Sequence, residues 1–161
     1  MPGPLEISTP SDREVMITRR FDAPRELVFD CHTKPALVRR WLLGPPGWTM
    51  PVCDIDLKVG GHYRYVWRGP GGEELGMGGT FRLIERPERI DTTELFDQDW
   101  TGGETLVTTR FTEAGGRTTA TLTVLYSSSK AREAALATGM TDGMESGYQR
   151  LDALLAAGAA G

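Results

Sequence analysis

Three glycines, Gly139, Gly143 and Gly147, recur at every fourth position in a segment whose apolar residues otherwise have helical spacing. On a helix they would share one flank of the apolar arc, whose members are Leu136, Met140, Met144, Tyr148, Leu151, Leu154 and Leu155. Each glycine in a helix interior costs roughly 1 kcal/mol relative to alanine. The pattern predicts a long helix over residues 129–156, whose glycine flank either packs closely on a sheet or lines a ligand cavity.

Before this helix, most of the chain has an apolar period of two, which is typical of antiparallel strands. The predicted strands cover residues 12–21, 52–57, 62–68, 75–84, 90–96, 104–112 and 118–126. Two short helices are expected between the first two strands, because apolar residues there have helical spacing after Pro24 and after Pro35. This order predicts an α+β helix-grip fold, in which a curved sheet of about seven strands wraps around the C-terminal helix.

The composition narrows the classes of protein and site. The 161 residues suit one domain, expected over residues 13–157 after a flexible tail at 1–12. A net charge of −4 without a basic patch argues against nucleic acid as a partner. No long apolar run or secretory leader is evident, so we expect no membrane insertion and a cytoplasmic location. Two cysteines and two histidines lack metal-ligand spacing, so neither a metal nor another cofactor is expected.

One strand of the predicted sheet carries an aromatic face made of Tyr63, Tyr65 and Trp67. If this face is concave, it meets the glycines and methionines of the long helix. Aromatic rings with polar ends and flexible methionines suit a planar or aromatic ligand, although a plain aromatic core has the same pattern. The ligand-binding candidates are therefore Tyr63, Tyr65, Trp67, Met77, Gly139, Met140, Gly143, Met144 and Gly147.

Three further tryptophans are candidates for the rim of this cavity. Trp41 and Trp48 flank a Gly-Pro-Pro-Gly loop, where they form either a lid or part of the buried core. Trp100 lies in a polar, glycine-rich loop over residues 97–103, and a gate at the opposite rim is one hypothesis for it.

A polar anchor for the cavity is expected from Glu94, which shares a strand face with Phe96, and from Arg110 on the next strand. If both charged side chains point inward, they form a partly buried ion pair that orients a polar ligand group; the alternative is that both face solvent. No Ser-His-Asp arrangement can be assembled, so no catalytic residue is predicted.

Several segments in a fixed order resemble one family. They are Phe21–Phe29, Arg40–Trp41 with Gly44–Pro45, Asp56–Gly61, Arg86–Ile90, and Thr138–Met140 through Leu151. Over residues 13–156 the chain resembles the branch of the START/Bet v-type (SRPBCC) superfamily that is named after activators of the heat shock protein 90 ATPase. The resemblance implies a helix-grip fold with a deep hydrophobic cavity, and it implies no single chemistry, since that superfamily includes lipid and hormone binders, polyketide cyclases and ring-hydroxylase subunits.

The favoured function is binding of a small hydrophobic or aromatic ligand between the sheet and the C-terminal helix. Two alternatives stay open. One is a stress-response interaction module that regulates a chaperone ATPase, with the chaperone as its partner; the other is a cyclase- or hydrolase-like enzyme acting on a hydrophobic substrate. A homodimer is also left open.

Overall fold

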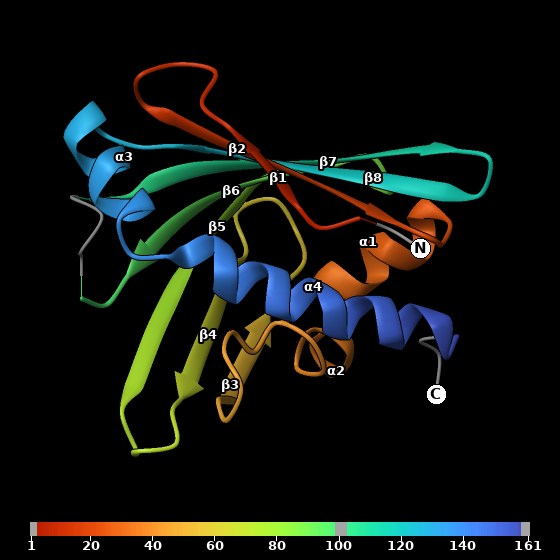
Figure 1. The fold of residues 1–161 in the computed structure, drawn as a ribbon, viewed down its shortest axis with the longest axis horizontal. Helices are drawn as coiled ribbons and strands as arrows, with labels where there is room; N and C mark the ends of the chain where they lie inside the picture. Colours follow the sequence, from red (N-terminus) through yellow and green to blue (C-terminus); the bar gives the residue numbers. More distant parts are fainter. Residues whose placement is uncertain (1–2, 99–102, 159–161) are drawn as a thin grey trace.

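One antiparallel sheet of eight strands, in the order β1-β2-β8-β7-β6-β5-β4-β3, is built from the residues that the structure describes. The structure is a computed structural model, and it describes residues 3–98 and 103–158. Four helices lie against the sheet (Figure 1). The strands are β1 Glu6–Ser8, β2 Glu14–Phe21, β3 Thr49–Ile55, β4 His62–Arg68, β5 Glu74–Glu85, β6 Arg89–Phe96, β7 Thr105–Ala114 and β8 Arg117–Leu125. The helices are α1 Arg25–Thr33, α2 Pro35–Val38, α3 Ser129–Leu136 and α4 Met140–Ala156.

The chain crosses the sheet once and then returns strand by strand. After β2 it passes through α1 and α2 to the far edge, where β3 begins a meander that ends with β8 beside β2. This confirms the predicted helix-grip fold, with one strand more than the pattern indicates. The extra strand is β1, which pairs with β2 in the segment expected to be a loose tail.

Register shifts bend β3 and β5, which lie in the half of the sheet that ends with β3. One lies in β3 between Thr49 and Val52, and the other lies in β5 between Phe81 and Leu83. Such irregularities increase the local twist and let a sheet curl. The glycines of β5 are not the cause of its register shift. They leave room for a neighbouring strand, because a Cβ on Gly79 would stand 1.9 Å from the backbone oxygen of Thr93. The register shift lies after the last of these glycines in the sequence.

The single long helix predicted for residues 129–156 is wrong, because the structure divides it in two. Ser128 caps α3, its hydroxyl accepting a hydrogen bond from the amide of Ala131 at 3.0 Å. Gly139 then takes a left-handed conformation with φ 73° and precedes the first residue of α4. A left-handed residue ends a helix, and glycine adopts that conformation without a Cβ penalty. Gly139 therefore redirects the chain, so that α4 crosses the open face of the sheet (Figure 1).

A buried arginine fastens α4 to the sheet. The side chain of Arg19 on β2 is 2% exposed, and its guanidinium donates hydrogen bonds to Glu145 and Asp152 of α4 over 2.7–3.2 Å. The same group lies over the rings of Phe21 and Tyr148, at 5.2 and 5.7 Å from their centroids. These contacts fix α4 along the sheet, and the space that remains between helix and sheet is the candidate site.

Candidate functional site

A cavity of about 640 Å³ lies between the inner face of the sheet and the layer formed by α2, the loop after it and α4. Alternate residues of the five consecutive strands β4 to β8 supply its sheet side, as a period of two requires. Of the residues proposed from the sequence, those at the cavity wall are Trp41, Trp48, Tyr63, Tyr65, Trp67, Met77, Glu94, Phe96, Gly139, Met140, Gly143, Met144 and Gly147.

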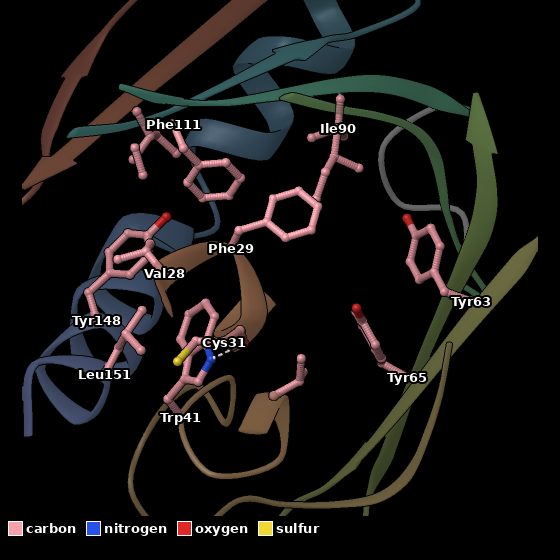
Figure 2. Close-up of a cluster of buried hydrophobic side chains, with 14 of the residues drawn as sticks. Val28, Phe29, Cys31, Trp41, Tyr63, Tyr65, Ile90, Phe111, Tyr148 and Leu151 are labelled. Carbon is pink, nitrogen blue, oxygen red and sulfur yellow. Dashed lines mark hydrogen bonds between the residues drawn. The ribbon is translucent and has the colours of Figure 1, made fainter. Parts of the chain in front are cut away.

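The aromatic face of β4 forms one wall of the cavity, so this face, whose side could not be assigned from the sequence, is the concave one. The ring centroids of Tyr63 and Tyr65 are 5.2 Å apart, and those of Tyr65 and Trp67 are 5.8 Å apart. The Tyr63 hydroxyl donates to the backbone oxygen of Thr93 at 2.7 Å, whereas no described residue binds the hydroxyl of Tyr65. Figure 2 shows both tyrosines on one side of the core, facing Trp41 and Phe29 across it.

Trp41 belongs to the opposite wall and is not a lid. It is 3% exposed, and its indole N–H donates to the backbone oxygen of Cys31 at 2.8 Å. Its ring stacks on that of Tyr148 at a centroid distance of 5.8 Å. The loop that follows Trp41 is hydrogen-bonded to both the sheet and α4. The Trp67 indole on β4 donates to the oxygen of Leu42, and Arg150 on α4 donates to the oxygen of Gly44, both at 2.7 Å.

Glu94 is a carboxylic acid at the wall of a mainly apolar cavity. No described residue donates a hydrogen bond to its carboxylate, and burial raises its pKa to about 7. Burial also raises the pKa values of Tyr63, Tyr65 and Tyr126, and the nearby charge of Glu94 raises them further. Glu94 is therefore an unpartnered acid facing the same space as several phenol groups.

His32 of α1 is a second titratable group at the cavity wall, and it is not among the residues proposed from the sequence. Its Nδ1 lies 2.7 Å from the backbone oxygen of Val28. A carbonyl only accepts, so Nδ1 carries the proton and Nε2 is left as an acceptor. Burial lowers the pKa of His32 to about 4, so the ring is neutral near neutral pH.

The predicted ion pair between Glu94 and Arg110 is wrong. In the register of β6 and β7, Glu94 stands opposite Thr105, and Arg110 stands opposite Arg89. Glu94 lines the cavity, whereas Arg110 is exposed and lies on the outer face of the sheet. The cavity thus has its carboxylate without the expected arginine.

The glycine flank of α4 lies at the cavity wall, which is one of its two predicted roles, but its close neighbours belong to the loop after α2 and not to the sheet. A Cβ on Gly143 would lie 3.7 Å from the side chain of Pro45, and one on Gly147 would lie 3.0 Å from the backbone oxygen of Trp41. Close backbone approach explains Gly147, and the left-handed turn explains Gly139. Gly143 has room for a methyl group at ordinary contact distance.

Trp100 lies outside the described residues. The structure also adds wall residues that were not proposed from the sequence, among them His32, Thr92, Thr109, Leu122, Tyr126, Asp142 and Tyr148. The strand period could have found Thr92, which shares a face with Glu94, and the helical arc could have found Tyr148. The strand period could also have found Tyr126, which shares a face with Leu122 and Val124. His32 reaches the cavity only through the packing of α1, which no local pattern reveals.

A second hollow, of about 660 Å³, lies over the outer face of β4, β5 and β6. Its wall carries exposed charged groups, including an ion pair between Arg64 and Asp97 at 2.6 Å.

Within residues 3–98 and 103–158 no three metal-ligating side chains gather at one point. None of the described helices has the length and apolar character that a membrane span needs. The inner cavity is therefore the candidate site.

Comparison with known proteins gives relatives of known structure. The chain is similar to a protein from Rhodobacter sphaeroides, with 37% identity, a TM-score of 0.91, and coverage of 96% of this chain and 99% of that one. A protein from Mycobacterium smegmatis matches with 27% identity, a TM-score of 0.83, and coverage of 94% and 97%. A heat shock protein 90 activator from Plasmodium falciparum shares the fold, with 24% identity, a TM-score of 0.55, and coverage of 71% and 73%. No curated protein matches the chain.

A family model also matches, and it covers residues 22–156. Those residues hold both walls of the cavity and nearly all of the fold described above. The chain therefore belongs to the family of Activator of Hsp90 ATPase homolog 1-like proteins.

Proposed function

We propose that this protein binds a small hydrophobic or aromatic molecule in the cavity between its sheet and α4. The observation that carries the proposal is the cavity itself, with a volume of about 640 Å³ and a wall rich in aromatic and methionine side chains. Protein interiors are normally close-packed, and pockets of a few hundred cubic ångströms or more are typical of ligand sites. The hydrogen bonds from Trp67 and Arg150 to the loop after α2 hold this part of the wall in place without a ligand, which supports a preformed cavity.

A cavity-filling variant tests the proposal. Leu122 of β8 lines the cavity, and the next residue, Thr123, points to the other face of the sheet. We expect Leu122→Trp to abolish uptake of the neutral dye N-phenylnaphthylamine, and the matched control Thr123→Trp to keep it. Dye fluorescence is the measurement, and circular dichroism checks the fold. Equal dye binding by both variants would contradict the proposal. Native mass spectrometry of protein from its own host then identifies what is bound.

A second candidate function follows from the family to which the chain belongs, whose description refers to activation of a chaperone ATPase. In this alternative the protein is a co-regulator, and its partner is heat shock protein 90. Addition of the purified chain to the chaperone from the same host should then raise ATP hydrolysis. A Leu122→Trp variant that still stimulates the ATPase would separate this function from ligand binding.

A further inference from the structure

The charges at the cavity wall are unequal, and they restrict the kind of ligand. Among the described wall residues there are two carboxylic acids, Glu94 and Asp142, and neither lysine nor arginine. The one histidine, His32, is neutral near neutral pH, because burial lowers its pKa to about 4. A fatty acid or a phosphate ester would therefore bring its negative charge into a wall that offers no cation.

Glu94 has the position of a ligand anchor. It is half-buried at the cavity wall on β6, while Asp142 is exposed at the first turn of α4. The Glu94 carboxylate receives no hydrogen bond from the described residues. A carboxylate held in apolar surroundings is costly unless a cation or hydrogen-bond donor pairs with it. A ligand that supplies both would satisfy the carboxylate that the described residues leave unpaired.

The aromatic groups near Glu94 favour the same ligand. Tyr63, Tyr65 and Tyr126 line the same cavity, and the charge of Glu94 raises the pKa values of their phenol groups. Ammonium groups are attracted to the faces of aromatic rings as well as to carboxylates. Most of the rest of the wall, including Met77 and Leu122, is apolar and suits a hydrophobic body.

We propose that the cavity selects hydrophobic or aromatic molecules that carry one basic amine, and that Glu94 binds the ammonium group. This inference rests on the proposed function, because it names the class of ligand for the same cavity. It departs from a general lipid-binding role, since fatty acids and phospholipids present anionic groups. Charge-assisted hydrogen bonds are about twice as strong as neutral ones, which sets the size of the expected preference.

Three matched probes test the proposal: naphthylethylamine, naphthylethanol and naphthylacetic acid. Isothermal titration calorimetry at about pH 8, where the amine and the Glu94 carboxylate are both ionised, measures each affinity. We expect the amine to bind about 10- to 100-fold more tightly than the alcohol, and the acid to bind more weakly than the alcohol. Glu94→Gln should remove the advantage of the amine over the alcohol. Asp142→Asn, which removes an exposed carboxylate, should change the amine affinity by no more than about twofold.

The outcomes distinguish the two proposals. If the alcohol binds and the amine binds no more tightly, ligand binding stands and the amine preference is wrong. If the acid binds most tightly, Glu94 donates from its protonated form and the inference is overturned. If none of the three probes binds, both proposals fail. Should Glu94→Gln not fold, the wild-type protein still decides, because amine affinity has to fall relative to alcohol affinity as the pH drops from about 8 to about 5. Of the other titratable groups at the described wall, Tyr63, Tyr65, Tyr126 and Tyr148 have pKa values raised by burial, and burial lowers the pKa of His32 to about 4, so none of these five titrates in this range.

Discussion

Arg19 on β2 and Asp152 on α4 are joined by two parallel hydrogen bonds, of 2.7 and 3.1 Å, at the boundary between the sheet and its covering helix. Glu145, which lies on the same face of α4 nearer its start, accepts hydrogen bonds from two more N–H groups of this guanidinium. The backbone oxygen of Arg20 accepts from the last one at 2.9 Å. All five donors of Arg19 are thus used. Glu145 also accepts the backbone amide of Leu5, so one carboxylate connects β1, β2 and α4.

Replacement of this arginine should release α4. Loss of one partner from a buried ion pair costs about 3–5 kcal/mol, and the partial exposure of the two carboxylates reduces this to about 2–3 kcal/mol. We therefore expect Arg19→Met to lower the free energy of unfolding by that amount in urea denaturation. The control is Arg20→Met, whose side chain is 62% exposed and pairs with Glu6 at 3.4 Å. A loss of less than about 0.5 kcal/mol is expected for it, and equal losses in the two variants would contradict the role of Arg19.

The two helix-interior glycines of α4 should respond differently to alanine. Gly143→Ala places a methyl group 3.7 Å from Pro45 and should stabilise the protein by about 0.5–1 kcal/mol, because alanine favours helix more than glycine does. Gly147→Ala places its methyl group 3.0 Å from the backbone oxygen of Trp41, so the same gain is offset by crowding. Thermal unfolding of both variants measures the difference. A higher melting temperature for Gly147→Ala than for Gly143→Ala would show that the loop after α2 yields easily.

The two tyrosines of β4 form a natural pair for testing hydrogen bonding. Tyr63→Phe removes a donor from the oxygen of Thr93 and should cost about 0.5–1.5 kcal/mol of stability. Tyr65→Phe removes a hydroxyl that no described residue binds, so its effect on stability should be close to zero. Urea denaturation of both variants is the measurement. If Tyr65→Phe proved the more costly change, its hydroxyl would have a partner that the described residues do not supply.

Glu94 should make the stability of the protein depend on pH in a direction opposite to that of most carboxylates. Burial raises its pKa from 4.5 to about 7, so the folded state holds its proton when the unfolded state has released it. Rising pH therefore favours unfolding between about 4.5 and 7, and the cost is constant above that range. Its size is about 1–3 kcal/mol.

Glu94→Gln removes this titration. The variant should gain stability over the wild type at about pH 8, and it should gain little at about pH 4. Melting temperatures of both proteins across this range provide the measurement. A difference between them that does not change with pH would mean that Glu94 is solvated and has an ordinary pKa. Glu145 provides the opposite case: burial alone would raise its pKa, but the hydrogen bonds from Arg19 and Leu5 outweigh this and hold it below the usual value.

The parts of the fold that depend on local pattern could be predicted from the sequence. Tyr63, Tyr65 and Trp67 alternate with polar residues, so their shared face follows from the geometry of a strand, and the hydrophobic partner of that face follows from the long apolar helix. The order of helices and strands then leaves few ways to close the sheet.

Features that depend on register or on distant partners could not be predicted. The register between β6 and β7 decides whether Glu94 stands opposite Arg110 or Thr105. This register depends on the length of the connection between the strands, which cannot be predicted from the apolar period. Arg19 alternates with Thr18 and Arg20 like any strand residue, and only the carboxylates of α4, more than a hundred positions later, make it a core residue. Gly139 has the same spacing as Gly143 and Gly147, yet it stands just before α4, whereas they lie within that helix.

The pairing of β2 with β8 has a consequence for the synthesis of the protein. Phe21 aligns with Thr118, so the second strand of the nascent chain has no neighbour on that side until the eighth has been made. The cavity needs α4 as well, which extends to Ala156. Until α4 has been made, the nascent chain therefore has no enclosed site, and any ligand enters after that point. Such long-range pairing is typical of slow-folding domains, so refolding should be slower than for a helical bundle of the same length.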